Sequence, residues 1–118
     1  MIATVFMKQS EIWLINLDPT FGAEIKKTRP AVIVNDDTLG RLPLKIIVPI
    51  TDWKENYSIA PWMVKIEPDN QNKLNKTSAA DCFQVRSISE LRFVRHIGKL
   101  DDNILDQIKE GLAKVFSI

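Results

Sequence analysis

Cationic and hydroxyl side chains are concentrated in one short segment, at Lys26, Lys27, Thr28 and Arg29, and Thr51 adds a hydroxyl at the end of a later apolar run. A planar guanidinium can bind two oxygens of a phosphate, and lysine or hydroxyl groups supply further donors. These residue types therefore suit a phosphate ligand. The simpler interpretation is a solvated lysine loop followed by an arginine that caps a strand.

Other catalytic devices lack the residues they need. The chain has one cysteine, Cys82, and one histidine, His96. They form neither an internal disulfide nor a zinc site by themselves, and a Ser-His-Asp or Cys-His system would require His96, which lies among apolar neighbours. We expect His96 to be structural and Cys82 to be a small buried hydrophobe. The carboxylates are scattered, so no metal or other cofactor is expected.

The residue pattern predicts the elements that position these groups. Apolar and β-branched runs bounded by proline or polar residues predict six strands, at 11–17, 29–35, 45–51, 62–67, 78–88 and 93–100. Pro49 lies inside the third of these runs, and a proline there argues for an edge strand or a bulge.

The C-terminal segment changes to a helical period. Ile104, Ile108 and Leu112 recur every four residues, and Asp101 precedes them as a candidate N-cap. The sequence therefore predicts a mainly β fold with a C-terminal α-helix, in which a strongly bent antiparallel sheet approaches a small barrel.

Length and composition limit the class of protein. A chain of 118 residues with 45% hydrophobic and 26% charged residues fits one globular domain spanning residues 1–118. The net charge of +1 means that any affinity for nucleic acid must come from a local basic patch. No apolar run is long enough to span a membrane, so we expect a cytoplasmic protein with no membrane partner.

Three blocks of sequence resemble the MazF/PemK/Kid family of toxin ribonucleases. They are EIWLINLDPT at 11–20 with Gly22 and Glu24, KTRPAVIV at 27–34, and VPIT at 48–51; QVRSI at 84–88 is a weaker fourth. The resemblance implies an SH3-like barrel of the PemK/Kid/CcdB type with a C-terminal helix. It also implies a homodimer that cleaves single-stranded mRNA at specific sequences without a metal, as the toxin of a toxin-antitoxin pair. A small antitoxin would inhibit it by laying a disordered tail in the RNA groove, and DNA would be a partner only through that antitoxin.

In this family the arginine of the Thr-Arg-Pro motif and the threonine that closes the third strand are catalytic, and they correspond to Arg29 and Thr51. Cleavage requires the ribose 2′-hydroxyl to attack the adjacent phosphorus, which gives a 2′,3′-cyclic phosphate and a free 5′-hydroxyl. Arg29 would stabilise the growing negative charge, since an arginine that stays protonated is a poor general base. Thr51 would add a hydroxyl donor.

The remaining site residues are expected to bind RNA. Phe21 and Trp53 would stack on unpaired bases, as aromatic side chains commonly do with single strands. Glu24 either orients Arg29 or contacts a base, unless it is a surface carboxylate paired with a nearby lysine. The full expected set is Phe21, Glu24, Lys26, Lys27, Thr28, Asp52, Trp53, Gln84 and Arg86.

One position departs from the family pattern. Several relatives carry an aspartate directly before the glutamine of the fourth block, where this chain has Phe83, with Asp81 two residues earlier. A carboxylate role at that position is therefore not expected here.

Two other functions compete with the nuclease. A toxin of the CcdB type shares the barrel and binds DNA gyrase without cutting RNA, and a catalytically silent SH3-like interaction module is a third possibility. Neither needs the motif around Arg29 together with Thr51, which favours the nuclease.

Overall fold

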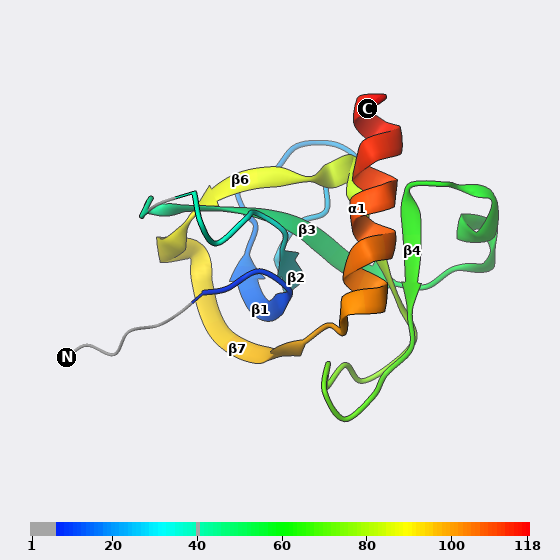
Figure 1. Ribbon diagram of the computed structural model, residues 1–118, viewed down its shortest axis with the longest axis horizontal. Coiled ribbons are helices and arrows are strands. Elements are labelled where there is room, and N and C mark those ends of the chain that lie inside the picture. Colours follow the sequence, from blue (N-terminus) through cyan, green and yellow to red (C-terminus); the bar gives the residue numbers. More distant parts are fainter. Residues whose placement is uncertain (1–6, 40) are drawn as a thin grey trace.

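Seven antiparallel strands and one C-terminal helix form the regular structure of the computed structural model, which describes residues 7–39 and 41–118 (Figure 1). The strands are β1 (Glu11–Asn16), β2 (Thr28–Ile33), β3 (Leu44–Asp52), β4 (Met63–Ile66), β5 (Ser78–Asp81), β6 (Arg86–Ser89) and β7 (Phe93–Lys99). The helix is α1 (Asp102–Phe116), and the short 3-10 helices are η1 (Glu55–Ile59), η2 (Cys82–Gln84) and η3 (Glu90–Arg92). The expected mainly β fold with a C-terminal helix is confirmed.

The strands form one bent sheet in the order β4-β5-β3-β2-β1-β7, and β6 also pairs with β3. Every pairing is antiparallel. Register shifts interrupt the β1–β7 pairing at two points, and such irregularities bend a sheet. Among the described residues no pairing joins the outer strands β4 and β7, so the sheet approaches a barrel without closing.

The predicted single strand at 78–88 is wrong, because the chain turns in its middle. The side chain of Asp81 accepts a hydrogen bond of 3.1 Å from the backbone N–H of Phe83, which caps η2. This turn separates β5 from β6. Both strands pair with β3 on different parts of its length, so the break gives β3 two partners on one side.

The prediction that Pro49 marks an edge strand is also wrong, because β3 is central. On one side of β3, residues Ile47 to Pro49 pair with Ile33 to Ala31 of β2. On the opposite side, β6 pairs up to Ile47 and β5 pairs from Ile50 onward. Pro49 lies between these two pairings, where β3 needs no ladder donor and a residue without an N–H is tolerated.

Both faces of the β2–β3 pair are buried, which explains the unbroken apolar runs in these strands. Val32 and Val48 belong to a larger core that also contains Ile108 of α1. The alternate residues Ala31 and Ile47 belong to a second core, together with residues such as Leu17 and Ile88. Side chains alternate along a strand, so odd-numbered positions of β2 and β3 face the second core.

The C-terminal helix follows the predicted pattern and covers the larger core. The carboxylate of Asp101 accepts a hydrogen bond of 2.8 Å from the N–H of Ile104, so it is the expected N-cap. Leu105 and Ile108 are buried, and α1 lies beside β4 and η2 (Figure 1). Within the part of the chain that the structure describes, no helix is long and apolar enough to cross a membrane.

Candidate active site

Arg29 and Thr51 lie on neighbouring strands and share one face of the sheet. The paired ladder of β2 and β3 reaches Ala31 opposite Pro49. Arg29 and Thr51 are each two residues beyond this pair, within the bounds of β2 and β3. Because side chains two residues apart point to the same side, both project on the face of the second core, at its open end. Each is partly exposed.

The backbone around Arg29 is tied to its neighbours. Arg29 pairs with Ile15 of β1, and its Nε donates a hydrogen bond of 3.1 Å to the carbonyl of Lys26. Thr51 pairs with Ala79 of β5. The guanidinium and the hydroxyl are therefore carried by paired strands rather than by free loops, which is the support that a preorganised site needs.

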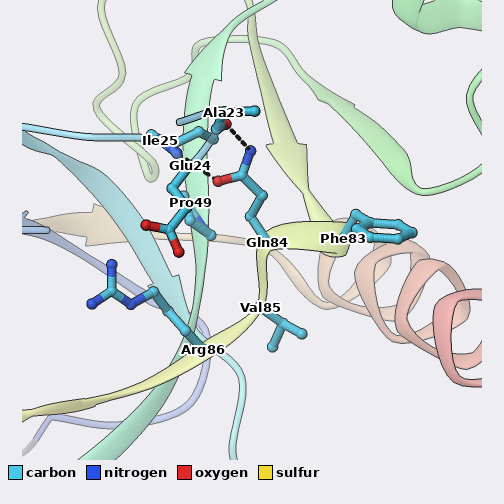
Figure 2. Close-up of a pocket in the computed structure, with 8 residues that line it drawn as sticks. All are labelled: Ala23, Glu24, Ile25, Pro49, Phe83, Gln84, Val85 and Arg86. Carbon is cyan, nitrogen blue, oxygen red and sulfur yellow. Dashed lines mark hydrogen bonds between the residues drawn. The ribbon is translucent and has the colours of Figure 1, made fainter. Parts of the chain in front are cut away.

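A hollow of about 500 Å³ includes Pro49 of β3 in its lining (Figure 2). Its lining residues come from the loop before β2, from β3 and from the η2–β6 segment: Ala23, Glu24, Ile25, Pro49, Phe83, Gln84, Val85 and Arg86. Pro49 is on the same face as Thr51, and two residues of strand span about 7 Å. Thr51 is therefore expected at the edge of the hollow.

Gln84 clamps the 23–25 loop to the rest of the hollow. Its Oε1 accepts a hydrogen bond of 2.6 Å from the N–H of Ile25, and its Nε2 donates to the carbonyl of Ala23 at 3.2 Å (Figure 2). The same Nε2 lies 3.4 Å from Oδ2 of Asp81. Since both ends of the amide are engaged, Gln84 holds the wall of the hollow as well as lining it.

The Asp81 carboxylate contacts the Gln84 amide and helps to hold it in place. Its side chain is buried, with 6% of the residue exposed. Burial raises the pKa of the Asp81 carboxyl, and the hydrogen bonds from Phe83 and Gln84 oppose that shift. The sequence offered Asp81 only as a neighbour of the family motif, so its supporting role was not predicted.

Glu24 and Arg86 supply the charged groups of the hollow, and Figure 2 shows the carboxylate and the guanidinium directed toward the same space. Oε1 of Glu24 accepts a hydrogen bond of 2.6 Å from the N–H of Phe21, while Nη1 of Arg86 donates to the carbonyl of Leu17 at 3.1 Å. The ion pairs of the described residues do not include Glu24, so the alternative that paired it with a lysine is not observed.

The basic loop is exposed but anchored at its base. Lys26, Lys27 and Thr28 all face solvent. The N–H of Lys27 donates to the Asp18 carboxylate at 3.1 Å, and this bond holds the pKa of Asp18 below its usual value. Lys27 has a φ of 71°, a left-handed conformation that the anchored turn imposes. The three side chains can therefore reach an anion while their backbone stays fixed.

The other expected RNA-binding residues lie outside the lining of the hollow. Phe21 is 83% exposed. Trp53 packs edge-on against Tyr57, and the Lys65 ammonium lies 5.1 Å from the centre of its ring. Asp52 forms an ion pair of 3.1 Å with Lys76. The structure thus groups Glu24, Gln84 and Arg86, while Asp52 and Trp53 follow Thr51 at the C-terminal end of β3.

Several lining residues were missed because they are apolar. Ala23, Ile25, Pro49, Phe83 and Val85 complete the hollow. Each lies within or next to one of the family blocks, and that proximity was the only available signal. Their convergence depends on contacts such as the one between Ile25 and Gln84, which are 59 residues apart in the chain.

The remaining reactive side chains are not directed at this site. Cys82 is completely buried, and burial, with a contribution from Asp81, raises its pKa to about 12. It is therefore the inert hydrophobe that was expected. His96 lies on β7 and packs edge-on against Trp13 at 5.4 Å. Among the residues described, His, Cys, Asp and Glu form no group of three that could hold a metal ion.

The bent antiparallel sheet and its C-terminal helix define a small, mainly β class of protein, and comparison with known proteins identifies the family. The family model "PemK-like, MazF-like toxin of type II toxin-antitoxin system" matches residues 8–116, so the chain belongs to this family.

Individual relatives agree with this assignment. The chain is 32% identical to endoribonuclease MazF9 of Mycobacterium tuberculosis over 110 residues, which cover 90% of this chain and 92% of the relative. Among solved structures, MazF from Deinococcus radiodurans superposes with a TM-score of 0.77 at 18% identity, covering 94% of this chain and 96% of the other. An endoribonuclease in complex with its cognate antitoxin from Mycobacterial species gives a TM-score of 0.73 at 12% identity, covering 94% and 95%. The two structures show that the fold is shared.

Proposed function

We propose that this protein is the toxin of a toxin-antitoxin pair and acts as an endoribonuclease that cleaves single-stranded mRNA at specific sequences, which inhibits translation and growth. The observation that supports the proposal is that Arg29 and Thr51 each lie two residues beyond the paired Ala31 and Pro49 of β2 and β3, and that Pro49 lines the hollow. Membership of the toxin family and the similarity to a protein named an endoribonuclease support it.

Arg29 and Thr51 are proposed to act on the scissile phosphate. As the 2′-hydroxyl attacks phosphorus, negative charge grows on the phosphate oxygens, and a guanidinium can bind two of them. Donors fixed toward developing charge contribute about 3 to 4 kcal/mol each in comparable sites. The Thr51 hydroxyl adds a second donor from the neighbouring strand.

Proton transfer limits the roles that Arg29 can take. A group that stays protonated cannot accept the 2′-hydroxyl proton, which is proposed to pass to solvent water. We assign Arg29 to charge stabilisation and to protonation of the departing 5′ oxygen, after which it regains a proton from water. The departing alkoxide is about as basic as hydroxide, so a protonated guanidinium is a strong enough acid to give it a proton. Because protein groups meet the charge, the reaction is proposed to need no metal.

The basic loop and the hollow are proposed to hold the RNA. Lys26, Lys27 and Thr28 would contact phosphates, and Glu24 and Arg86 would contact bases within the hollow. Phe21 is exposed enough to stack on a base. Trp53 and Asp52, at the end of β3, would contact a more distant nucleotide, while Gln84 acts by holding the loop.

The proposed partners follow from the family. A relative in fold was solved with its cognate antitoxin, and we propose that an antitoxin likewise binds this chain and covers the RNA groove. The active form is proposed to be a cytoplasmic homodimer of a single-domain chain spanning residues 1–118. Contact with DNA would occur only through the antitoxin.

Incubation of the purified protein with a long single-stranded RNA in EDTA tests the proposal. We expect discrete fragments whose upstream pieces end in a 2′,3′-cyclic phosphate and whose downstream pieces begin with a 5′-hydroxyl. The control is the same RNA annealed to its complement, which should resist cutting. Intact RNA, or fragments with 5′-phosphates, would contradict the proposed reaction.

A further inference from the structure

We propose that Phe83, at the rim of the hollow, forms a stacking subsite for one unpaired base of the RNA. This inference rests on the proposed function. The Phe83 ring is exposed, it is held by an aromatic neighbour, and it lines the hollow.

Phe83 is one of several large apolar side chains that are exposed on the described surface. Phe83 is 65% exposed although it adjoins Cys82, which is completely buried. The turn that presents it is fixed, because Asp81 accepts a hydrogen bond from the N–H of Phe83. A buried carboxylate therefore fixes the turn that carries this exposed aromatic ring.

The orientation of the ring is fixed by an aromatic neighbour. Phe83 packs edge-to-face on Trp62, with ring centres 5.8 Å apart and planes at 64°. The two rings restrain each other through this contact, and the exposed part of the Phe83 ring stays open to a further stacking partner. A base that stacks there meets a rigid platform and loses little entropy in ordering it.

The lining of the hollow offers both apolar surface and hydrogen-bonding groups. A volume of about 500 Å³ is within the range of small-molecule pockets. Pro49 and Val85 supply apolar surface, while Glu24 offers an acceptor and Arg86 offers donors. Unpaired bases in RNA are bound by this combination of a stacked face and a hydrogen-bonded edge.

A binding assay with RNA that cannot be cut tests the subsite. The probe is a 2′-O-methyl oligoribonucleotide spanning a mapped cleavage site, and the variants are Phe83→Ala, Phe83→Leu and Phe83→Trp. We expect Phe83→Ala and Phe83→Leu to bind about 5- to 150-fold more weakly, the range for loss of one base–aromatic stack. Phe83→Trp should bind at least as well as the original protein. The matched control is Ile59→Ala, which truncates another exposed apolar side chain, 87% exposed, and should leave affinity unchanged.

Abasic nucleotides identify the base that is stacked. In the original protein, removal of one particular base should weaken binding to the same degree as Phe83→Ala. In Phe83→Ala, removal of that base should have no further effect. Equal affinity of Phe83→Ala and the original protein would overturn the subsite. A shift of Phe83→Ala from dimer to monomer with unchanged RNA affinity would also overturn it, in favour of a protein interface.

Cleavage assays separate this proposal from the proposed function. If the original protein cuts RNA and Phe83→Ala cuts it with the same KM and the same site preference, the subsite alone is wrong. If the original protein neither binds nor cuts RNA, the proposed function fails and the subsite fails with it.

Discussion

Some side chains of the site face the hollow, and others hold the segments that line it in place through hydrogen bonds. Gln84 is the clearest of the second kind, because its amide connects the backbone of Ala23 and Ile25 with the carboxylate of Asp81. A residue that the family pattern marks as a base contact is here committed to the protein itself. Its effect on RNA is therefore expected to operate through the position of the 23–25 loop.

Replacement of Gln84 by leucine should release this loop. Gln84→Leu keeps the side-chain size but leaves the N–H of Ile25 without its acceptor, at a cost of about 1–3 kcal/mol if the group stays buried. We expect faster hydrogen exchange at the Ile25 amide and a raised KM for RNA, with kcat less affected.

The matched variant is Gln84→Glu, which retains an acceptor for the Ile25 N–H but loses the donor to Ala23 and Asp81. It should keep most of the protection at Ile25. Unchanged exchange and an unchanged KM in Gln84→Leu would show that the clamp does not position the loop.

At the scale of elements, the spacing of apolar residues and the position of proline and polar residues predicted the strands and the helix that depend on nearby sequence alone. The strand predicted at 11–17 is β1 (Glu11–Asn16), and the helix begins after its predicted cap at Asp101. The break between β5 and β6 was missed because it depends on how Asp81 caps a turn, and the role of Pro49 was misjudged because β3 changes partners there. Both features depend on which strands pair with one another in the folded protein, and a pattern of neighbouring residues does not determine that.

The site shows the same division. The family blocks marked Arg29, Thr51, Glu24 and Arg86, whereas the apolar wall of the hollow and the clamp beneath it came only from the structure. A wall of apolar residues carries no chemical signal in sequence. It becomes a pocket only when segments about 60 residues apart meet.

Gly98 lies where β7 packs closely against the backbone of the 71–72 loop. A Cβ at this position would lie 2.5 Å from the carbonyl oxygen of Asn72 and 2.6 Å from that of Gln71. Backbone atoms cannot yield as a side chain can, so Gly98→Ala should lower the free energy of unfolding by about 1–3 kcal/mol. Urea denaturation measures the change.

Val94→Ala, on the same strand and mainly exposed, is the control and should stay within about 0.5 kcal/mol of the original protein. Equal stability of Gly98→Ala and Val94→Ala would mean that β7 and the 71–72 loop can separate at little cost.

For the molecule as a whole, the near-neutral net charge of +1 restricts how RNA is attracted. The overall field of the protein is weak, so binding must depend on a few local contacts between cations and phosphates. The exposed Lys26 and Lys27 are the expected contributors, beside the partly exposed Arg29.

Salt should therefore weaken RNA binding, and the plot of log affinity against log salt concentration should have a small slope that reflects the few phosphates neutralised. Each phosphate neutralised on a single strand contributes about −0.7 to the slope of log affinity against log salt concentration. We expect Lys26→Ala and Lys27→Ala each to reduce the slope by about that amount in a titration with uncleavable RNA. Affinity that does not depend on salt would argue against a groove centred on phosphates.

The central claim is that Arg29 and Thr51 act on one phosphate, and a double-mutant cycle measures it most directly. Cleavage rates at saturating RNA are compared for the original protein, Arg29→Ala, Thr51→Val and the double variant, with circular dichroism confirming that each is folded. The account predicts that Arg29→Ala lowers kcat by at least about 100-fold, and that the double variant loses less than the product of the two single losses. Full activity in Arg29→Ala, or single losses that simply multiply, would contradict it.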